Sequence, residues 1–395
     1  MMFCSIIGQN FLPHARVLAL SLAEHHPDCR LDLLIVDALD EPAVPGEPFR
    51  RVGLSELALS LEEINRRRTL YEIEALSSSL RGPLLEGCLR RSGGTAVYLD
   101  ADMLVLGSLA DIGPLAERHG IVLTPHSTVP SRFKPDGFGA EQAFLQAGVF
   151  NGGFLAVSTS AAEFLRWRDE RVSRDCVVAF DRYILHGQLW LSLVPALFEH
   201  HVLKDRGVNL MVHGMGDDDV TWRGKQPWIG ETPIRLFHFG GGVEPHSGEF
   251  MGSRPTPPWW PRASERPGLA RLYRAYGERL LSAGFDSKVE SKSLLDAPMR
   301  KAYRDALIAA EANKSPEPPN PFTHGETVFT SWLAAPAWPG RYVSRYLAAV
   351  HAARADLRAA FPRVPGEDEH SLLEWVARKY KGNLPAGLPT AAAMI

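Results

Sequence analysis

The stretch Thr-Ala-Val-Tyr-Leu-Asp-Ala-Asp-Met-Leu-Val-Leu-Gly, residues 95–107, decides how this chain is interpreted. Its first apolar run, residues 96–99, is β-prone and short, which is typical of a strand buried on both faces in a parallel sheet. Two carboxylates, Asp100 and Asp102, follow at its carboxyl end, and a second apolar run, residues 103–106, begins directly after them. Acidic groups between two buried runs are costly unless something compensates their charge.

A divalent cation is one way to compensate these acids. Mg²⁺ and Mn²⁺ prefer oxygen ligands, and Mg²⁺ is commonly bound by one or two carboxylates together with substrate phosphates. We therefore interpret Asp100 and Asp102 as ligands of a cation that holds the diphosphate of a bound nucleotide. The alternative is a turn at the end of a strand whose acids are hydrated, and the spacing alone does not separate the two.

The composition sets limits on the class of protein. The chain has 395 residues, of which 45% are hydrophobic and 23% charged, and this suits one large domain plus a smaller one. A formal net charge of −3 argues against a general binder of nucleic acid. We find no apolar run long enough to cross a bilayer, and residues 1–11 lack the flanks of a secretion signal. Four widely spaced cysteines predict thiols in a reducing, cytoplasmic setting: Cys4, Cys29, Cys88 and Cys176.

The beginning of the chain predicts an α/β fold. Residues 3–7 predict a buried strand, residues from about 13 a helix, and residues 31–36 a second strand that Asp37 closes. This order is typical of an open sheet in which ligands bind beyond the carboxyl ends of the strands. Because Gly8, Asp37 and the Asp100/Asp102 pair all fall at such ends, we expect them to face one crevice.

Two later motifs are compatible with that crevice. Asn151-Gly152-Gly153 precedes a predicted strand, and it suits either a plain hairpin turn or a platform of backbone and amide groups for a sugar. His238 ends another predicted strand and is followed by Gly240-Gly241-Gly242, where main-chain N–H groups could take up a diphosphate. A histidine in a strand is more often a core or surface residue than a ligand, so this motif alone leaves both interpretations open.

The rest of the chain is mainly helical in pattern. Residues 54–89 predict helix with a break at Gly82-Pro83. The Pro- and Trp-rich residues 254–261 suggest a domain boundary, so we expect a catalytic domain over residues 1–262 and a helical extension over residues 263–395. The extension has four predicted helices, at residues 269–283, 298–313, 341–361 and 372–380.

Taken together and in order, the motifs resemble those of GT-A-fold glycosyltransferases, and they are most similar to the retaining type that includes glycogenin and bacterial lipopolysaccharide galactosyltransferases. The similarity covers roughly the first two-thirds of the chain. The C-terminal region resembles a helical extension found in bacterial members. The stretches that carry the resemblance are Ser5-Ile6-Ile7-Gly8-Gln9-Asn10, Tyr98-Leu99-Asp100-Ala101-Asp102, Phe150-Asn151-Gly152-Gly153-Phe154 and Leu236-Phe237-His238-Phe239-Gly240-Gly241.

The resemblance implies a Rossmann-like, mostly parallel catalytic domain and a role for particular residues. Asp100, Asp102 and His238 would bind Mn²⁺ or Mg²⁺, with Asp100 also near the ribose. The nucleoside and phosphates would contact a second set of residues, and the sugar a third. The nucleotide set is Ile7, Gly8, Asn10, Arg81 and Gly240, and the sugar set is Asn151, Gly152 and, near the anomeric carbon, Gln188.

The implied activity is metal-dependent transfer of a hexose from a nucleoside-diphosphate sugar, most commonly a UDP-sugar, with retention. The acceptor could be a glycan, a lipid-linked saccharide, a peptide or a small molecule. A nucleotidyltransferase is disfavoured because residues 8–13 do not form a glycine- and lysine-rich phosphate loop. One departure keeps an alternative open: relatives usually carry Asp before Gln188, whereas this chain has Gly187. A catalytically silent nucleotide-sugar-binding or scaffold protein is therefore the second hypothesis.

Overall fold

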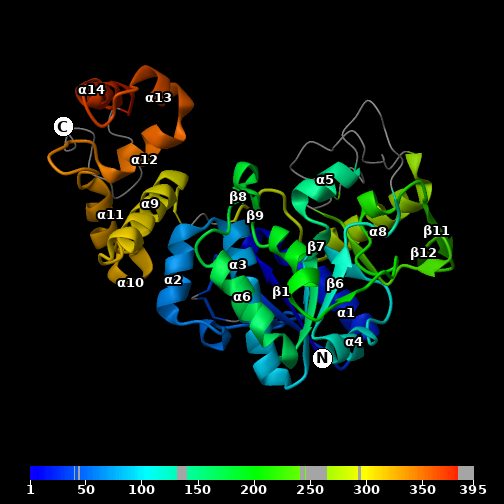
Figure 1. Cartoon of the computed structure of the whole chain (residues 1–395). Helices are drawn as coiled ribbons and strands as arrows, with labels where there is room; N and C mark the ends of the chain where they lie inside the picture. Colours follow the sequence, from blue (N-terminus) through cyan, green and yellow to red (C-terminus); the bar gives the residue numbers. More distant parts are fainter. Residues whose placement is uncertain are drawn as a thin grey trace. The chain divides into compact units, whose positions relative to one another are not determined.

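A computed structural model of the chain describes residues 1–39, 41–42, 45–130, 140–240, 245, 265–291 and 295–380 (Figure 1). The chain divides into two compact units. The first consists of Met1–Leu59 and Ile73–Lys292, and the second of Ser60–Glu72 and Ser293–Ile395. The helix that opens at residue 61 therefore belongs to the unit formed by the end of the chain. The predicted domain boundary after residue 262 lies outside the described residues and stays a prediction.

The first unit contains a seven-stranded sheet with the strand order β10-β6-β7-β4-β1-β2-β3. All neighbouring strands are parallel except β7, which is antiparallel to both β4 and β6. The predicted α/β class with a mostly parallel sheet is thus confirmed. The strands of this sheet are β1 (Met2–Ile7), β2 (Leu31–Ile35), β3 (Arg50–Arg51), β4 (Thr95–Leu99), β6 (Ile121–Pro125), β7 (Phe150–Ser158) and β10 (His201–Val202).

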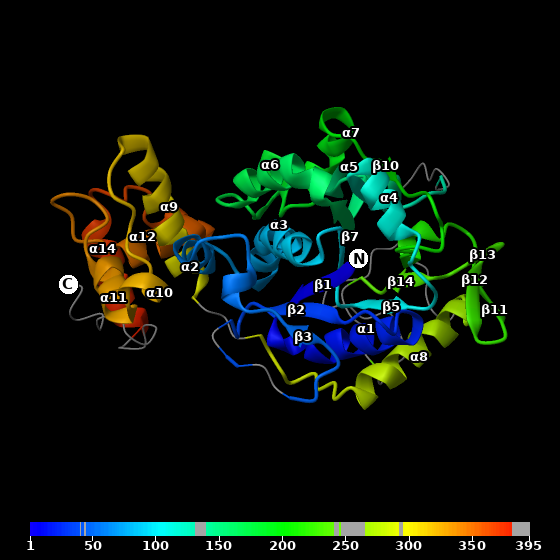
Figure 2. The same cartoon turned by 90° about the horizontal axis from the view of Figure 1, so that it is seen from below.

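Helices cover both faces of this sheet (Figure 2). Alternate residues of a strand point to opposite faces, and Phe3 and Ile7 belong to one buried apolar cluster together with the inner side of α1 (Leu12–His25) and Ile112 of α4 (Ile112–His119). The other face carries α3 (Ile73–Ser92), which packs against β1 and β4. The remaining helices of the unit are α5 (Ala140–Ala147), α6 (Ala162–Val172), α7 (Val194–Leu197) and α8 (Pro267–Ser282), with short 3₁₀ turns between elements.

The direction of β7 brings the Asn-Gly-Gly motif to the edge where β1 and β4 end. Because β7 is antiparallel to β4, its first residues lie beside the last residues of β4, with Phe154 opposite Leu99. The backbone N–H of Asp100 donates to the carbonyl of Gly153 at 2.8 Å. Asn151 and Gly152 lie within β7 itself, so the hairpin-turn interpretation of this motif is wrong.

A two-stranded sheet completes the same edge. β5 (Met103–Val105) pairs antiparallel with β14 (Leu236–His238), and the register places Met103 opposite His238. The N–H of Phe239 donates to the carbonyl of Asp102 at 3.0 Å. These bonds bring His238 beside the Asp100/Asp102 motif, although 135 positions separate Met103 from His238 in the chain. The smaller strands are β8 (Val178–Ala179), β9 (Ile184–Leu185), β11 (Val220–Arg223), β12 (Gln226–Ile229) and β13 (Thr232–Pro233).

The second unit is helical, as predicted for the end of the chain. Its core includes Val343, Leu347, Leu372 and Val376, and α2 packs with α9 and α10. Its helices are α2 (Leu61–Leu70), α9 (Ala297–Asn313), α10 (Pro321–His324), α11 (Glu326–Ala334), α12 (Arg345–Ala353), α13 (Ala355–Ala360) and α14 (Glu369–Tyr380). None of the helices in the described part of the chain combines the length and the apolar character that crossing a bilayer needs.

Two predicted helix boundaries are wrong. Gly82-Pro83 does not break the helix, because α3 runs through it and residues 82–85 are all buried. A proline inside a helix removes one hydrogen bond, and here tertiary packing outweighs that loss. The helix predicted over residues 341–361 is instead interrupted at Arg354, whose extended backbone (φ −105°, ψ 113°) separates α12 from α13.

A buried ion pair holds the outer strands of the sheet to α3. Asp32 on β2 is almost fully buried, and both its oxygens accept from Arg50 of β3 at 2.7 Å. Arg91 at the end of α3 also donates to Asp32. Removing one partner of a buried pair leaves uncompensated charge, which costs about 3–5 kcal/mol when the partners are fully buried.

We predict that Asp32→Ala lowers the free energy of unfolding by about 2–3 kcal/mol, less than the fully buried limit because both arginines are partly exposed and can be hydrated. Urea denaturation followed by fluorescence measures this change. Asp111→Asn, which removes a charge from the half-exposed pair with Arg235, is the matched control and should change the free energy by less than about 1 kcal/mol. Equal effects of the two variants would contradict the prediction.

Candidate functional site

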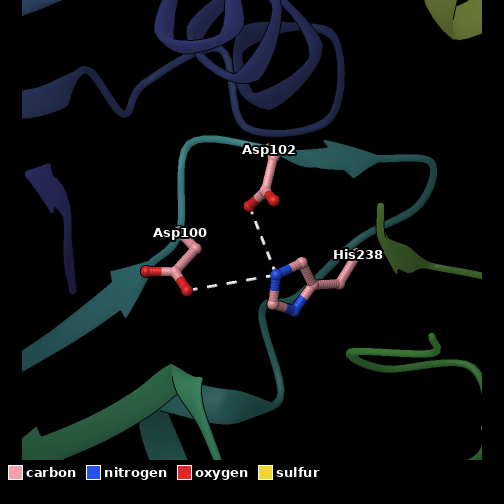
Figure 3. Close-up of side chains that lie close together, drawn as sticks. All are labelled: Asp100, Asp102 and His238. Carbon is pink, nitrogen blue, oxygen red and sulfur yellow. Dashed lines mark ion pairs between the residues drawn. The ribbon is translucent and has the colours of Figure 1, made fainter. Parts of the chain in front are cut away.

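Two aspartates and a histidine converge at the carboxyl edge of β4. Nε2 of His238 lies 3.2 Å from Oδ1 of Asp102 and 3.9 Å from Oδ2 of Asp100 (Figure 3). One ligand atom from each of the three residues falls within 4.8 Å of the others. Figure 3 shows the aspartates on the loop between β4 and β5, with the imidazole facing both of them. The structure therefore brings together the three side chains that the sequence analysis assigned to a metal.

The donor set suits a divalent cation. Two carboxylates favour hard ions such as Mg²⁺ and Mn²⁺, and an imidazole adds a ligand that the transition metals accept readily. The Asp102 and His238 side chains are 10% and 6% exposed, whereas Asp100 is 32% exposed and opens to the neighbouring cavity. A cation held here would therefore keep one side free for a ligand that enters from the cavity.

Asn209 orients the histidine and was not foreseen from the sequence. Its Oδ1 lies 3.1 Å from Nδ1 of His238, so the imidazole donates from Nδ1 and turns Nε2 toward the aspartates. Its amide nitrogen donates to Thr124 at 2.7 Å. Such outer contacts fix the tautomer of a ligating histidine. No local sequence pattern marks Asn209 for this role; in the structure it adopts a positive φ of 56°, which asparagine tolerates better than most residues.

Arg81 and Tyr98 hold Asp100 from the opposite side. The Tyr98 hydroxyl donates to Oδ1 of Asp100 at 2.8 Å, and Arg81 lies 3.4 Å from the same oxygen with its guanidinium 4.0 Å above the Tyr98 ring. Burial lowers the pKa of Arg81, but the nearby Tyr98 and Asp100 outweigh it, and the net shift is upward. Arg81 also donates to the carbonyl of Gly152. The guanidinium of Arg81 thus connects Asp100, a candidate metal ligand, with the start of β7.

A cavity of about 570 Å³ adjoins these residues. Its lining includes most of the residues predicted to contact a nucleotide sugar, and the loop after β1 is fixed there because Asp37 accepts from the N–H of Gln9 at 2.9 Å. The predicted site residues in the lining are Ile7, Gly8, Asn10, Arg81, Asp100, Asp102, Gly152 and Gln188. A volume of this size is typical of a small-molecule site.

Three predicted residues are not part of that lining. His238 stands behind the aspartates, and Asn151 is buried, where its Oδ1 accepts from the N–H of Gly153 at 2.8 Å. Gly240 adopts a positive φ of 62°, and the residues directly after it lie outside the described chain. The roles predicted for Asn151 and Gly240 stay predictions.

Gln188 links the cavity wall to β7. Its Oε1 accepts from the N–H of Gly152 at 2.9 Å, and its Nε2 donates to the carbonyl of Ala147 at 2.9 Å. These two bonds fix the orientation of the amide. Each group has capacity for a second hydrogen bond, so the side chain can still contact a ligand in the cavity.

Comparison with known proteins gives no sequence relative. No protein-family model matches the chain, and no curated protein matches it. Solved structures to which the chain is similar are glycosyltransferases. They include an active-site mutant of LgtC (20% identity, 62% of this chain and 89% of that chain, TM-score 0.34). LgtC itself, a galactosyltransferase in complex with donor and acceptor sugar analogues, gives 17% identity over 73% of this chain and 98% of that chain, with a TM-score of 0.34.

A third similar structure is the apo form of the glycosyltransferase GlyE of Streptococcus pneumoniae TIGR4. It shares 11% identity over 74% of this chain and 66% of that chain, with a TM-score of 0.37. Each TM-score is below 0.5, and the function proposed below therefore rests on the residues of this chain.

The pH dependence of metal binding tests His238 as a ligand. Burial lowers the pKa of His238, but attraction and a hydrogen bond from Asp102, with attraction from Asp100, outweigh it and raise the pKa above its ordinary value of 6.5. A cation must displace that proton, because a ligating imidazole is neutral. Without metal, the protonated imidazole stabilises the fold below about pH 6.5, and this contribution is lost as pH rises through the raised pKa.

We therefore predict that the increase in melting temperature caused by Mn²⁺ grows between pH 5.5 and pH 8, while the stability contributed by His238 in the metal-free protein falls. Differential scanning fluorimetry with and without Mn²⁺ measures both trends. His238→Gln should flatten the pH dependence of the Mn²⁺ effect. A Mn²⁺ effect in the wild type that is constant over this range would refute the assignment.

Gly153 offers a test that replaces none of the three candidate ligand residues. A Cβ at this position would lie 2.6 Å from Oδ2 of Asp100 and 2.6 Å from Cε1 of His238, closer than side chains pack. We predict that Gly153→Ala separates the ligands and weakens Mn²⁺ binding by about tenfold or more, which is about 1.4 kcal/mol. Isothermal titration with Mn²⁺ measures the affinity.

The matched control is Gly94→Ala, where the nearest atom to the added Cβ is 3.9 Å away. Its affinity for Mn²⁺ should equal that of the wild type. Wild-type affinity in a folded Gly153→Ala protein would show that the cation binds elsewhere.

Proposed function

We propose that this chain is a metal-dependent glycosyltransferase that moves a sugar from a nucleoside-diphosphate sugar to an acceptor. The observation that carries the proposal is the convergence of Asp100, Asp102 and His238 at the edge of a cavity lined by the residues of the β1 loop, α3 and β7. A cation site beside a cavity of this size, with a fixed arginine at its border, suits a ligand in which a pyrophosphate joins two uncharged groups, a nucleoside and a sugar.

Three groups of residues would bind the three parts of this ligand. The loop of Gly8 and Asn10 would line the nucleoside, since it lies at the carboxyl end of β1 where open sheets bind ligands. The two aspartates and His238 would hold Mn²⁺ or Mg²⁺, which when bound neutralises and polarises phosphate oxygens. Gly152 and Gln188, at the start of β7 and in the facing wall, would contact the sugar.

During transfer the protein must stabilise the charges that develop as the donor is cleaved. As the glycosidic bond to the diphosphate breaks, positive charge gathers at the anomeric carbon and negative charge on the leaving diphosphate. Arg81 is already fixed by Tyr98 and Asp100, so its charge needs no reorganisation when the negative charge develops. In this proposal the side-chain oxygen of Gln188 and the carbonyl oxygen of Gly152 would face the anomeric carbon; in the free protein they accept from the N–H of Gly152 and from Arg81. Among the described residues we assign no side chain as a general base.

The proposal also covers the identity of the donor and the stereochemistry of transfer. We propose a UDP-sugar donor and transfer with retention, on the resemblance of the sequence motifs. The cavity beside the β1 loop and the three candidate cation ligands support this proposal. The acceptor class is left open among a glycan, a lipid-linked saccharide, a peptide and a small molecule.

A panel of nucleoside-diphosphate sugars with Mn²⁺ tests binding, and release of the nucleoside diphosphate tests turnover. We expect at least one donor to raise the melting temperature only when Mn²⁺ is present, and to be hydrolysed or transferred. Because removing one ligand displaces the cation from the leaving diphosphate, Asp102→Asn should lower turnover by about 100-fold or more. Asp28→Asn, which changes an exposed acid that is not part of the candidate site, is the charge-matched control.

The outcomes separate the hypotheses. Metal-dependent binding that is never followed by turnover with any acceptor would favour a silent nucleotide-sugar-binding protein. Absence of binding for the entire panel, or unchanged metal dependence in Asp102→Asn, would refute the proposal.

A further inference from the structure

Arg168 of α6 is buried, and within the described part of the chain its guanidinium forms no ion pair, although the more distant Asp169 attracts its charge. The side chain is 1% exposed, and its Nε and Nη1 have no hydrogen-bond partner. Its one hydrogen bond runs from Nη2 to the carbonyl of Ser78 at 3.2 Å. A guanidinium has five N–H donors, and proteins rarely bury one with so few of them used and with no carboxylate in an ion pair. The cost of this arrangement calls for a functional explanation.

The guanidinium lies directly behind the wall of the proposed donor cavity. Ser78 and Gln188 both line that cavity, and Ser78 Oγ accepts from the N–H of Gly187 at 3.1 Å. A Cβ at residue 187 would overlap Nη2 of Arg168, so the arginine fills the space that a side chain there would need. A side chain at residue 187 would therefore displace the guanidinium of Arg168, which contacts Ser78 and Gly187 behind the cavity wall.

The charge persists at neutral pH and adds to that of Arg81. Burial and the neighbouring Arg81 lower the pKa of Arg168 to about 10, which still leaves it protonated. Asp100 offsets Arg81 in the free protein. When a divalent cation binds, however, the two aspartates balance that ion, and they no longer offset the charges of the partly buried Arg81 and the buried Arg168. The pyrophosphate of a nucleoside-diphosphate sugar carries two negative charges, which match them.

We propose that Arg168 is the buried counter-charge for the pyrophosphate of the donor, a positioning residue that acts across the wall formed by Ser78 and Gly187. This inference rests on the proposed function. Electrostatic attraction across a desolvated wall is stronger than across water, so the residue favours an anionic ligand without touching it. The same charge destabilises the ligand-free fold, because its desolvation is not repaid until the anion binds.

The charge of Arg168 thus strengthens anion binding but lowers the stability of the ligand-free protein, and a single variant can distinguish these two effects. Arg168→Met keeps a similar volume and removes the charge. We expect its melting temperature to equal or exceed that of the wild type, while its affinity for UDP with Mn²⁺ falls by about tenfold. Its affinity for uridine, which lacks phosphate, should stay within about twofold. Arg168→Lys keeps a charge and should recover most of the UDP affinity. Arg166→Met, on the exposed side of α6, is the matched control and should leave both affinities unchanged.

Isothermal titration and melting curves distinguish the outcomes. If UDP does not bind the wild type, the comparison of UDP with uridine is repeated with ADP, GDP, CDP and dTDP and their nucleosides. If the wild type binds none of these diphosphates, the proposed function itself is refuted. If the wild type binds and Arg168→Met loses stability and weakens nucleoside and diphosphate equally, Arg168 is a structural residue and the inference is wrong. An Arg168→Met protein too unstable to titrate also overturns the inference, as does an Arg168→Lys protein that gains no UDP affinity over Arg168→Met.

Discussion

Electrostatic compensation of two aspartates at the end of a buried strand is the constraint on which the rest of the structure depends. Asp100 and Asp102 are separated by one residue, and the strands on either side of them are fully buried. Their mutual repulsion in a partly desolvated place is tolerated because His238 lies against both and because Tyr98 and Arg81 contact Asp100. Each compensating group comes from a different element, so the site assembles only when the whole edge of the sheet is formed.

The strand directions explain why these groups meet. Parallel β1 and β4 end at one edge, and antiparallel β7 begins there, which adds the backbone of residues 151–153. The β5–β14 pair then carries His238 back to the loop between the aspartates. Gly153 is the point of closest approach, since a side chain there would enter the space between Asp100 and His238. The contacts that pack the edge of the sheet are therefore also the contacts that bring the residues of the site together.

The sequence predicted the parts of this arrangement that depend on local pattern. Short apolar runs ending in polar residues identified β1, β2 and β4, and the spacing of the acidic pair suggested a cation. His238 was joined to that pair through the family resemblance and not through its local pattern. The sequence could not identify Asn209, because the residue acts through a contact with His238 that only the fold creates. It also placed a break at Gly82-Pro83, since local propensity does not register the burial that keeps α3 continuous. Arg168 was likewise invisible, because arginine on a helix is usually a surface residue.

The central claim is that one cation is held jointly by the aspartates, by His238 and by the phosphates of a nucleotide. Electron–nuclear double resonance of bound Mn²⁺ tests it most directly, because the ion senses the nuclei of its own ligands. With UDP present, the account predicts coupling to phosphorus and to one histidine nitrogen in the same Mn²⁺ spectrum, with the nitrogen coupling absent from His238→Gln. A nitrogen coupling that survives in His238→Gln, or phosphorus coupling to an ion that has no nitrogen coupling in the wild type, would contradict the account.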